Sequence, residues 1–284
     1  METSTESTQK LQRTLLTDFK ENIEIIRFEV KRIIITLKYF IALSLVLLPA
    51  IIFLNSISKD YEALLINLGR ENFERYATTS FVLVGQFLMQ MMGIMLALDS
   101  FGKSTHESMQ RYFALPIRRA NIFTAHTTTV IIGTILTGFI GILVFDLILW
   151  VWTGIAISAI LLMKAFLMTF IGAFLAIAVT TMFIVIANYF NFSSSLAIIP
   201  TLFLFYIIPF LVNFISDFAF GLPKAYQWTF MYQLAVATDF FIQQDFGLHE
   251  VLDWTAKRTA WLTISLVIVV SEIIALIMFI ETER

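Results

Sequence analysis

The sequence of 284 residues contains no cysteine, few charged residues and only three histidines. The absence of cysteine excludes disulfide bonds and cysteine-ligated metal sites. The histidines, His106, His126 and His249, lack the spacing of a metal site. Charged residues make up 14% of the chain and its net charge is −2, which argues against nucleic acid as a partner. We therefore expect no metal and no cofactor bound to this chain.

Hydrophobic residues are abundant instead: they make up 58% of the chain, and its 29 phenylalanines lie mostly in long uncharged runs. Soluble domains are only about half apolar and about one quarter charged. A membrane-spanning helix needs about 20 mostly apolar residues. Six runs meet this requirement, at about residues 38–57, 79–98, 122–151, 164–187, 195–215 and 261–280. The predicted fold class is therefore all-α integral membrane, with residues 38–284 forming one domain of six transmembrane helices.

The region between the last two spans, residues 216–260, contains a seventh apolar run at 222–242. Lys224, Gln227 and Asp239 make this run a poor span, so we expect a short re-entrant or interfacial helix there.

Lysine and arginine in the loops predict the orientation. Twelve of the 19 lie in the N-terminal segment up to Lys38, in the loop 99–121 or at the C-terminus. Both termini and this loop are therefore expected in the cytoplasm, with residues 216–260 outside. The predicted location is the cell membrane, as a multi-pass protein. The first 37 residues are highly charged and have no early apolar core, so no cleavable signal peptide is expected.

The cytoplasmic N-terminus, residues 1–37, contains a predicted amphipathic interfacial helix. Its apolar stripe has the 4, 3, 4 spacing of one helical face. The stripe comprises Phe19, Ile23, Ile26, Val30, Ile33 and Leu37. Such a helix beside a span usually lies in the membrane interface. It is interpreted as a membrane-surface anchor, and the alternative is that its polar face also contacts a cytosolic partner.

Residues 97–104, ALDSFGKS, end like a phosphate-binding loop. Such a loop needs a strand before it and a helix after it. Here a predicted transmembrane helix precedes it, and the cytoplasmic segments are too short for a nucleotide-binding domain, which needs roughly 100 residues. We therefore expect this chain not to bind ATP.

The cytoplasmic loop continues with a predicted short helix. Ser104 and Glu107 have the spacing of a capping box, and Pro116 stops the helix. Arg118 and Arg119 then fall at the lipid headgroups. The loop can be a compact unit that transmits force from a soluble partner to two spans, or an ordinary basic loop that sets the topology.

The six predicted spans and this loop resemble the ABC-2 type permeases, the membrane subunits of ATP-binding-cassette exporters. The family's loop carries a Glu, a hydrophobic stretch and then Leu-Pro-(Ile/Val)-x-Arg. The matching residues here are Glu107, Tyr112, Leu115, Pro116, Ile117, Arg118 and Arg119. The family often has Arg-Glu followed by Gly-Thr, and this chain departs from that pattern with His106-Glu107 and Ser108-Met109.

The resemblance implies a translocation pathway formed with a second permease copy or a paralogue. It also implies a coupling helix at about residues 104–114 that docks on a separate ABC ATPase subunit. ATP and magnesium would be bound by that subunit, and this chain would not itself be an enzyme. An ion-coupled secondary transporter that uses Glu272 is the alternative. An intramembrane enzyme or a passive assembly factor is a third class, disfavoured because polar residues within the spans are few.

Four polar residues within predicted spans are candidates for translocation or gating, because charged and polar groups in a bilayer usually face a partner or a cavity. Glu272 lies near the middle of the sixth span, and a structural hydrogen bond is the alternative role. Gln86 and Gln90 share one face of the second span with Gly93. Helix contacts, with a dimer seam as the favoured use, are the alternative there. Asp146 could contact substrate or reach water at the headgroups.

Overall fold

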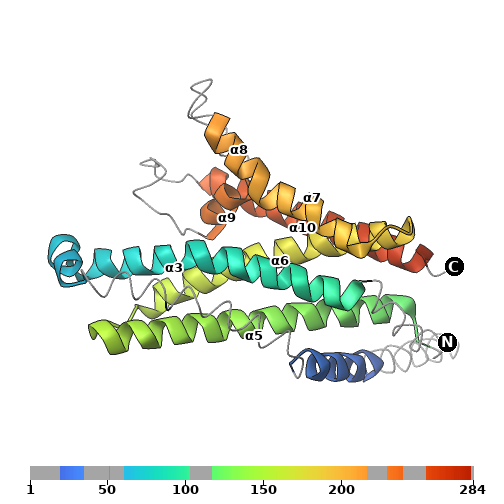
Figure 1. Cartoon of the computed structure of the whole chain (residues 1–284), viewed down its shortest axis with the longest axis horizontal. Helices are drawn as coiled ribbons and strands as arrows, with labels where there is room; N and C mark the ends of the chain where they lie inside the picture. Colours follow the sequence, from blue (N-terminus) through green and yellow to red (C-terminus); the bar gives the residue numbers. More distant parts are fainter. Residues whose placement is uncertain are drawn as a thin grey trace, which may run out of the picture.

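The computed structural model describes residues 20–34, 51, 61–102, 117–215, 229–238 and 254–282, and every element of secondary structure in these ranges is helical (Figure 1). Among these described residues, four segments are long and apolar enough to cross a membrane: Arg119–Thr153, Ala159–Tyr189, Ser194–Val212 and Lys257–Glu281. The chain is therefore a helical protein of membrane-embedded character. The first predicted span, 38–57, lies outside the described residues except for Ile51, and the second is not among these four.

Three helices agree with predicted spans and extend a few residues beyond them: α5 (Arg119–Thr153), α6 (Ala159–Tyr189) and α10 (Trp254–Thr282). The second predicted span, 79–98, is helical throughout but belongs to a much longer helix, α3 (Tyr61–Phe101). A break at Gly69, where φ is 73°, separates its first residues from the rest. The charged turn after the break is helical because Arg70 and Glu74 pair across four residues, at 3.2 Å.

The fifth predicted span is irregular. It consists of η1 (Ser194–Ala197), α7 (Ile198–Leu202), η2 (Phe203–Ile207) and α8 (Ile208–Ile215), and η2 is a π-helical turn. Pro209 explains the π turn, since it lacks an N–H group and its ring clashes with the carbonyl group of Phe205 four residues earlier. Pro200 lies in the first turn of α7, where a missing N–H group costs little. The region 222–242 contains the expected short helix, α9 (Phe230–Thr238).

The helices α3, α6 and α10 run in the same direction, and α5 runs in the opposite direction (Figure 1). One end of the bundle therefore holds the last residues of α3, α6 and α10 together with the start of α5, and we call it the loop end. The other end, which we call the turn end, holds residues 154–158 between α5 and α6. Residues 103–116, which connect α3 to α5, are outside the described ranges.

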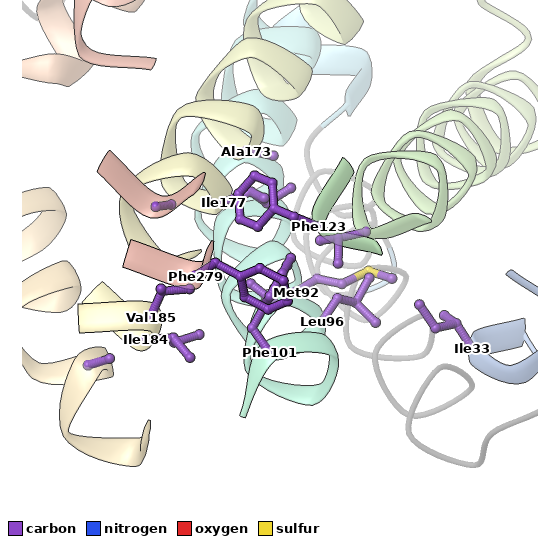
Figure 2. Packing of buried hydrophobic residues seen from close by; sticks show 14 of the residues in the cluster. Ile33, Met92, Leu96, Phe101, Phe123, Ala173, Ile177, Ile184, Val185 and Phe279 are labelled. Atoms are coloured by element: carbon purple, nitrogen blue, oxygen red, sulfur yellow. The ribbon is translucent and has the colours of Figure 1, made fainter. Parts of the chain in front are cut away.

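Helix α6 is the centre of the bundle and contacts α3, α5, α9 and α10. Small residues allow helices to approach closely in lipid. At Gly93 of α3, an added Cβ atom would lie 2.8 Å from Cγ1 of Ile177 on α6, so no larger residue fits without a shift. Figure 2 shows the packing toward the loop end, where Ile177 lies in one hydrophobic cluster with Phe101, Phe123 and Phe279 of three other helices.

The N-terminal helix, residues 20–34, packs on this bundle, and its buried residues are Ile25, Glu29 and Ile33. Of the predicted apolar stripe, Ile33 is buried, at 1% exposed, beside Gly133 of α5, whereas Ile23 is 48% exposed. Phe19 and Leu37 lie outside the described residues. The buried face also contains Glu29, because its carboxylate pairs with Arg32 at 2.8 Å. Ile26 and Val30 of the stripe are half-buried, so the stripe borders the face that contacts the bundle.

Candidate functional site

Most residues predicted to contact an ATPase lie outside the described ranges: Ser104, Glu107, Tyr112, Leu115 and Pro116. Arg118 and Arg119 are described. Arg118 is exposed and extended, with φ −67° and ψ 133°, and it precedes the first residue of α5. Arg119 donates a hydrogen bond from Nη1 to the carbonyl oxygen of Ile280, at 3.1 Å. The start of α5 is thus tied to the last turns of α10.

The segment before residues 103–116 is tied to a different helix. The side chain of Asn188, near the end of α6, donates from Nδ2 to the carbonyl oxygen of Phe101, at 2.8 Å. Its Oδ1 accepts a hydrogen bond from the Ser194 hydroxyl group of η1, also at 2.8 Å. Asn188 therefore connects the end of α3 with both α6 and η1.

Aromatic rings fill the space between these two attachments. The ring centroids of Phe101 and Phe123 are 5.5 Å apart, and Phe279 of α10 lies 5.5 Å from Phe123 and 6.3 Å from Phe101. Such pairs add to the stability gained from apolar burial. Both flanks of residues 103–116 are consequently anchored on the same rigid group of helix ends.

A second polar group lies inside the bundle, and we call it the polar seam: Gln86, Gln90, Gly172 and Tyr206. Gln90 of α3, which is 5% exposed, donates from Nε2 to the carbonyl oxygen of Gly172 on α6, at 3.4 Å. Its Oε1 accepts a hydrogen bond from the hydroxyl group of Tyr206, at 2.8 Å. One amide thus connects α3, α6 and the π-helical turn η2.

Glycine at position 172 is what allows the two amides to approach α6. A Cβ atom added there would lie 2.9 Å from Nε2 of Gln86 and 3.3 Å from Nε2 of Gln90. Gln86 is 2% exposed, and neither polar atom of its side chain has a hydrogen-bond partner among the described residues. An unsatisfied amide is costly in an apolar environment, so Gln86 can accept and donate further hydrogen bonds.

Gln90 and Gly93 contact α6 of the same chain, at the Gly172 carbonyl group and at Ile177. A dimer seam at this face stays a prediction. The pattern did not reveal Tyr206, because an isolated tyrosine in an apolar run has no distinctive spacing. The two prolines flanking η2 were the available signal, since π turns often mark functional sites.

Asp146 and Glu272 are not part of the polar seam. Asp146 lies at the turn end, where its Oδ1 accepts a hydrogen bond from the backbone N–H group of Ile157, at 2.9 Å. Its described contact is therefore structural. Glu272 is half-buried on α10, and its Oε1 is buried with no hydrogen-bond partner in the described part of the chain. A structural hydrogen bond for this oxygen, one of the two predicted roles, is not found among those residues.

The polar seam is uncharged and consists of amides, a phenol and backbone carbonyl groups. It can donate and accept hydrogen bonds between helices, and displacement of η2 from α3 would break the contact between Tyr206 and Gln90. Within the described ranges, no group of three or more histidine, aspartate or glutamate residues could hold a metal ion.

A search of known protein-family models gives no match to this sequence, and a search of curated proteins gives none either.

Proposed function

We propose that this chain is the membrane-spanning permease subunit of an ABC-2 type exporter, driven by separate ATPase subunits. The observation that carries the proposal is the anchoring of both flanks of residues 103–116, the segment that holds most of the family-like motif. Through Asn188 and Arg119, a displacement of this segment would reach α6, η1 and α10 as well as α3 and α5. A loop that transmits the motion of an ATPase subunit to the membrane helices needs such hydrogen bonds to several helices.

The proposal includes six spans, with residues 38–57 and 79–98 as the first two and both termini in the cytoplasm. The loop end would face the cytoplasm because Arg118 and Arg119 lie there. The pathway would form between two permease copies or paralogues. The polar seam would act as a gate within each copy, because it links a continuous helix to an irregular one.

Affinity purification from native membrane tests this function, with Arg118→Glu compared with the wild type. Reversing an exposed charge at a docking surface changes the partner's binding, so we expect at least about a fivefold loss of co-purified ATPase subunit. Arg258→Glu is the matched control, since Arg258 is also an exposed arginine but lies near the turn end, on α10. This control should retain wild-type amounts. If no nucleotide-binding chain accompanies the wild type, the permease assignment fails.

An ion-coupled transporter is the second candidate, and the buried oxygen of Glu272 supports it. A carboxyl group inside a membrane commonly marks a proton or ion path. In vesicles containing the purified chain alone and a trapped pH dye, this candidate requires proton flux that Glu272→Gln abolishes. A permease that depends on an ATPase would show no such flux.

A further inference from the structure

The N-terminal helix, residues 20–34, presents an unusual outer face. Lys20, Ile23, Arg27, Lys31 and Ile34 follow one another at spacings of 3, 4, 4 and 3 residues, and all five are exposed. This spacing places them in one row along a helix. The row spans 11 residues between its two lysines, which is about 16 Å of helix.

The opposite face is committed to the bundle. Ile25 and Glu29 are buried there, and Ile33 contacts the position of Gly133 on α5. The helix is therefore fixed in its rotation about its own axis. Turning the outer row toward the bundle would remove the buried residues, including Glu29, from their contacts. The exposure of the row is a consequence of the fold.

The charges in the row are available for an external partner. Within the described part of the chain, Lys20, Arg27 and Lys31 form no ion pair. Among the described residues of this helix, Glu21 and Glu24 are the acidic residues outside the buried face, so the three cations of the row leave a positive local charge. The two isoleucines of the row, and Phe28 beside it at 60% exposed, would be poorly placed in water.

The helix packs on α5 close to exposed apolar residues. Beyond Gly133, where Ile33 packs, Leu136 and Ile140 of α5 are exposed large hydrophobic residues. In a helix bundle of membrane-embedded character, such a surface faces acyl chains. The helix thus lies beside the lipid-facing surface, with cations and isoleucines directed outward together.

We infer that this outer row binds the headgroups of acidic phospholipids, with its isoleucines inserted among the upper acyl chains. A surface of anionic headgroups above hydrocarbon matches both components of the row. A soluble acidic protein would match the cations but not the exposed isoleucines and phenylalanine. The inference does not depend on the transport function proposed above.

The test uses the full-length protein in nanodiscs made from an equal mixture of phosphatidylglycerol and phosphatidylcholine. After transfer to mild detergent, the two lipids retained on the protein are quantified by mass spectrometry. We expect the wild type to retain phosphatidylglycerol preferentially, and K20Q/R27Q/K31Q to lose about tenfold of that preference. Glu24→Gln, which removes the neighbouring acid, should increase the preference, and Arg258→Gln, on α10 near the turn end, should leave it unchanged.

Salt provides a second measurement that needs no variant. Raising the ionic strength from about 0.15 to 1 M shortens the screening length from about 8 to 3 Å, so the wild-type preference should fall toward that of the triple variant. If the triple variant retains the wild-type preference, or if the preference is insensitive to salt, the inference is wrong.

Because the chain contains no cysteine, Ile23→Cys and Ile66→Cys can each be labelled singly with a polarity-sensitive fluorophore, and both side chains are exposed. Ile66 precedes the break at Gly69 and lies outside the predicted spans. Adding lipid-soluble quencher to the nanodiscs should quench the label at position 23 more strongly than the label at position 66. Equal quenching would contradict insertion of the outer row.

Discussion

The two ends of the bundle are closed by opposite kinds of hydrogen bond. At the turn end, side-chain oxygens accept from backbone N–H groups: Asp146 accepts from Ile157, and Glu74 accepts from Ser158 at 3.3 Å. At the loop end, side-chain nitrogens donate to backbone carbonyl groups: Asn188 donates to Phe101, and Arg119 donates to Ile280. Carboxylates serve one end and an amide and a guanidinium group serve the other.

This difference follows from the parallel direction of α3, α6 and α10. The first turn of a helix has unsatisfied N–H groups and the last turn has unsatisfied carbonyl groups. Ser158 is the N-cap residue of α6 and Ile157 precedes it, so the acceptors lie just where α6 begins, whereas the donors lie where α3 and α10 finish. The helix dipoles act in the same sense, favouring anions where helices begin and cations where they end. A bundle of alternating helices would mix the two chemistries.

The largest effect is expected at the turn end. Asp146→Ala leaves the N–H group of Ile157 without its acceptor and should lower stability by about 2 kcal/mol, typical of a hydrogen bond to a charged group. Asp146→Asn retains Oδ1 and should lose less than half as much. The midpoint of thermal unfolding in one fixed detergent measures both. Equal losses would mean that the charge, and not the acceptor, is what the turn requires.

A smaller effect is expected at the loop end. Asn188→Ala removes the donor to Phe101 and the acceptor for Ser194, and should cost about 1–2 kcal/mol for the two neutral bonds. Ser194→Ala removes one of these bonds and serves as the matched control. Hydrogen exchange at the end of α3 should accelerate in the first variant and not in the second. Identical exchange would show that Asn188 does not hold this end.

The smallest effect is expected for Glu74→Gln. The amide oxygen can still accept from Ser158, so the main loss is the ion pair with the exposed Arg70, worth about 0.5 kcal/mol. Because salt screens such a pair, the difference in unfolding midpoint between variant and wild type should shrink at high salt. A large, salt-independent loss would show that the carboxylate acts on the turn as Asp146 does.

The helices themselves were largely predictable, because a long apolar run in a chain with so little charge has few alternatives to a helix. The runs at 122–151, 164–187 and 261–280 correspond to α5, α6 and α10. The early start of α3 was missed because residues 70–78 are polar, and hydropathy does not register a helix that extends beyond the apolar run. The π turn at Phe203–Ile207 overlaps the turn that Pro209 interrupts, and hydropathy alone does not indicate it.

The contacts between helices were less predictable. Gln86, Gln90 and Gly93 could be assigned to one face, but the sequence does not state that α6 covers it or that Tyr206 reaches Gln90. Asn188 lies in the last turn of α6 and carries no motif. On the N-terminal helix, the apolar stripe predicted a helix, but it gave no sign that Glu29 is buried beside its partner Arg32.

The π-helical turn at Phe203–Ile207 has a consequence for how this chain can change in evolution. A π turn accommodates one residue more than the α-helical turn it replaces. Deleting a single residue within it would restore a regular helix, and the residues of α8 would keep the sides that they now present, because the turn already absorbs the extra residue. In a regular α-helix the same deletion would rotate every following residue by about 100°, one residue's step around the axis. Loss of one codon at this point is thus tolerated where elsewhere in a helix it would change the whole surface that follows.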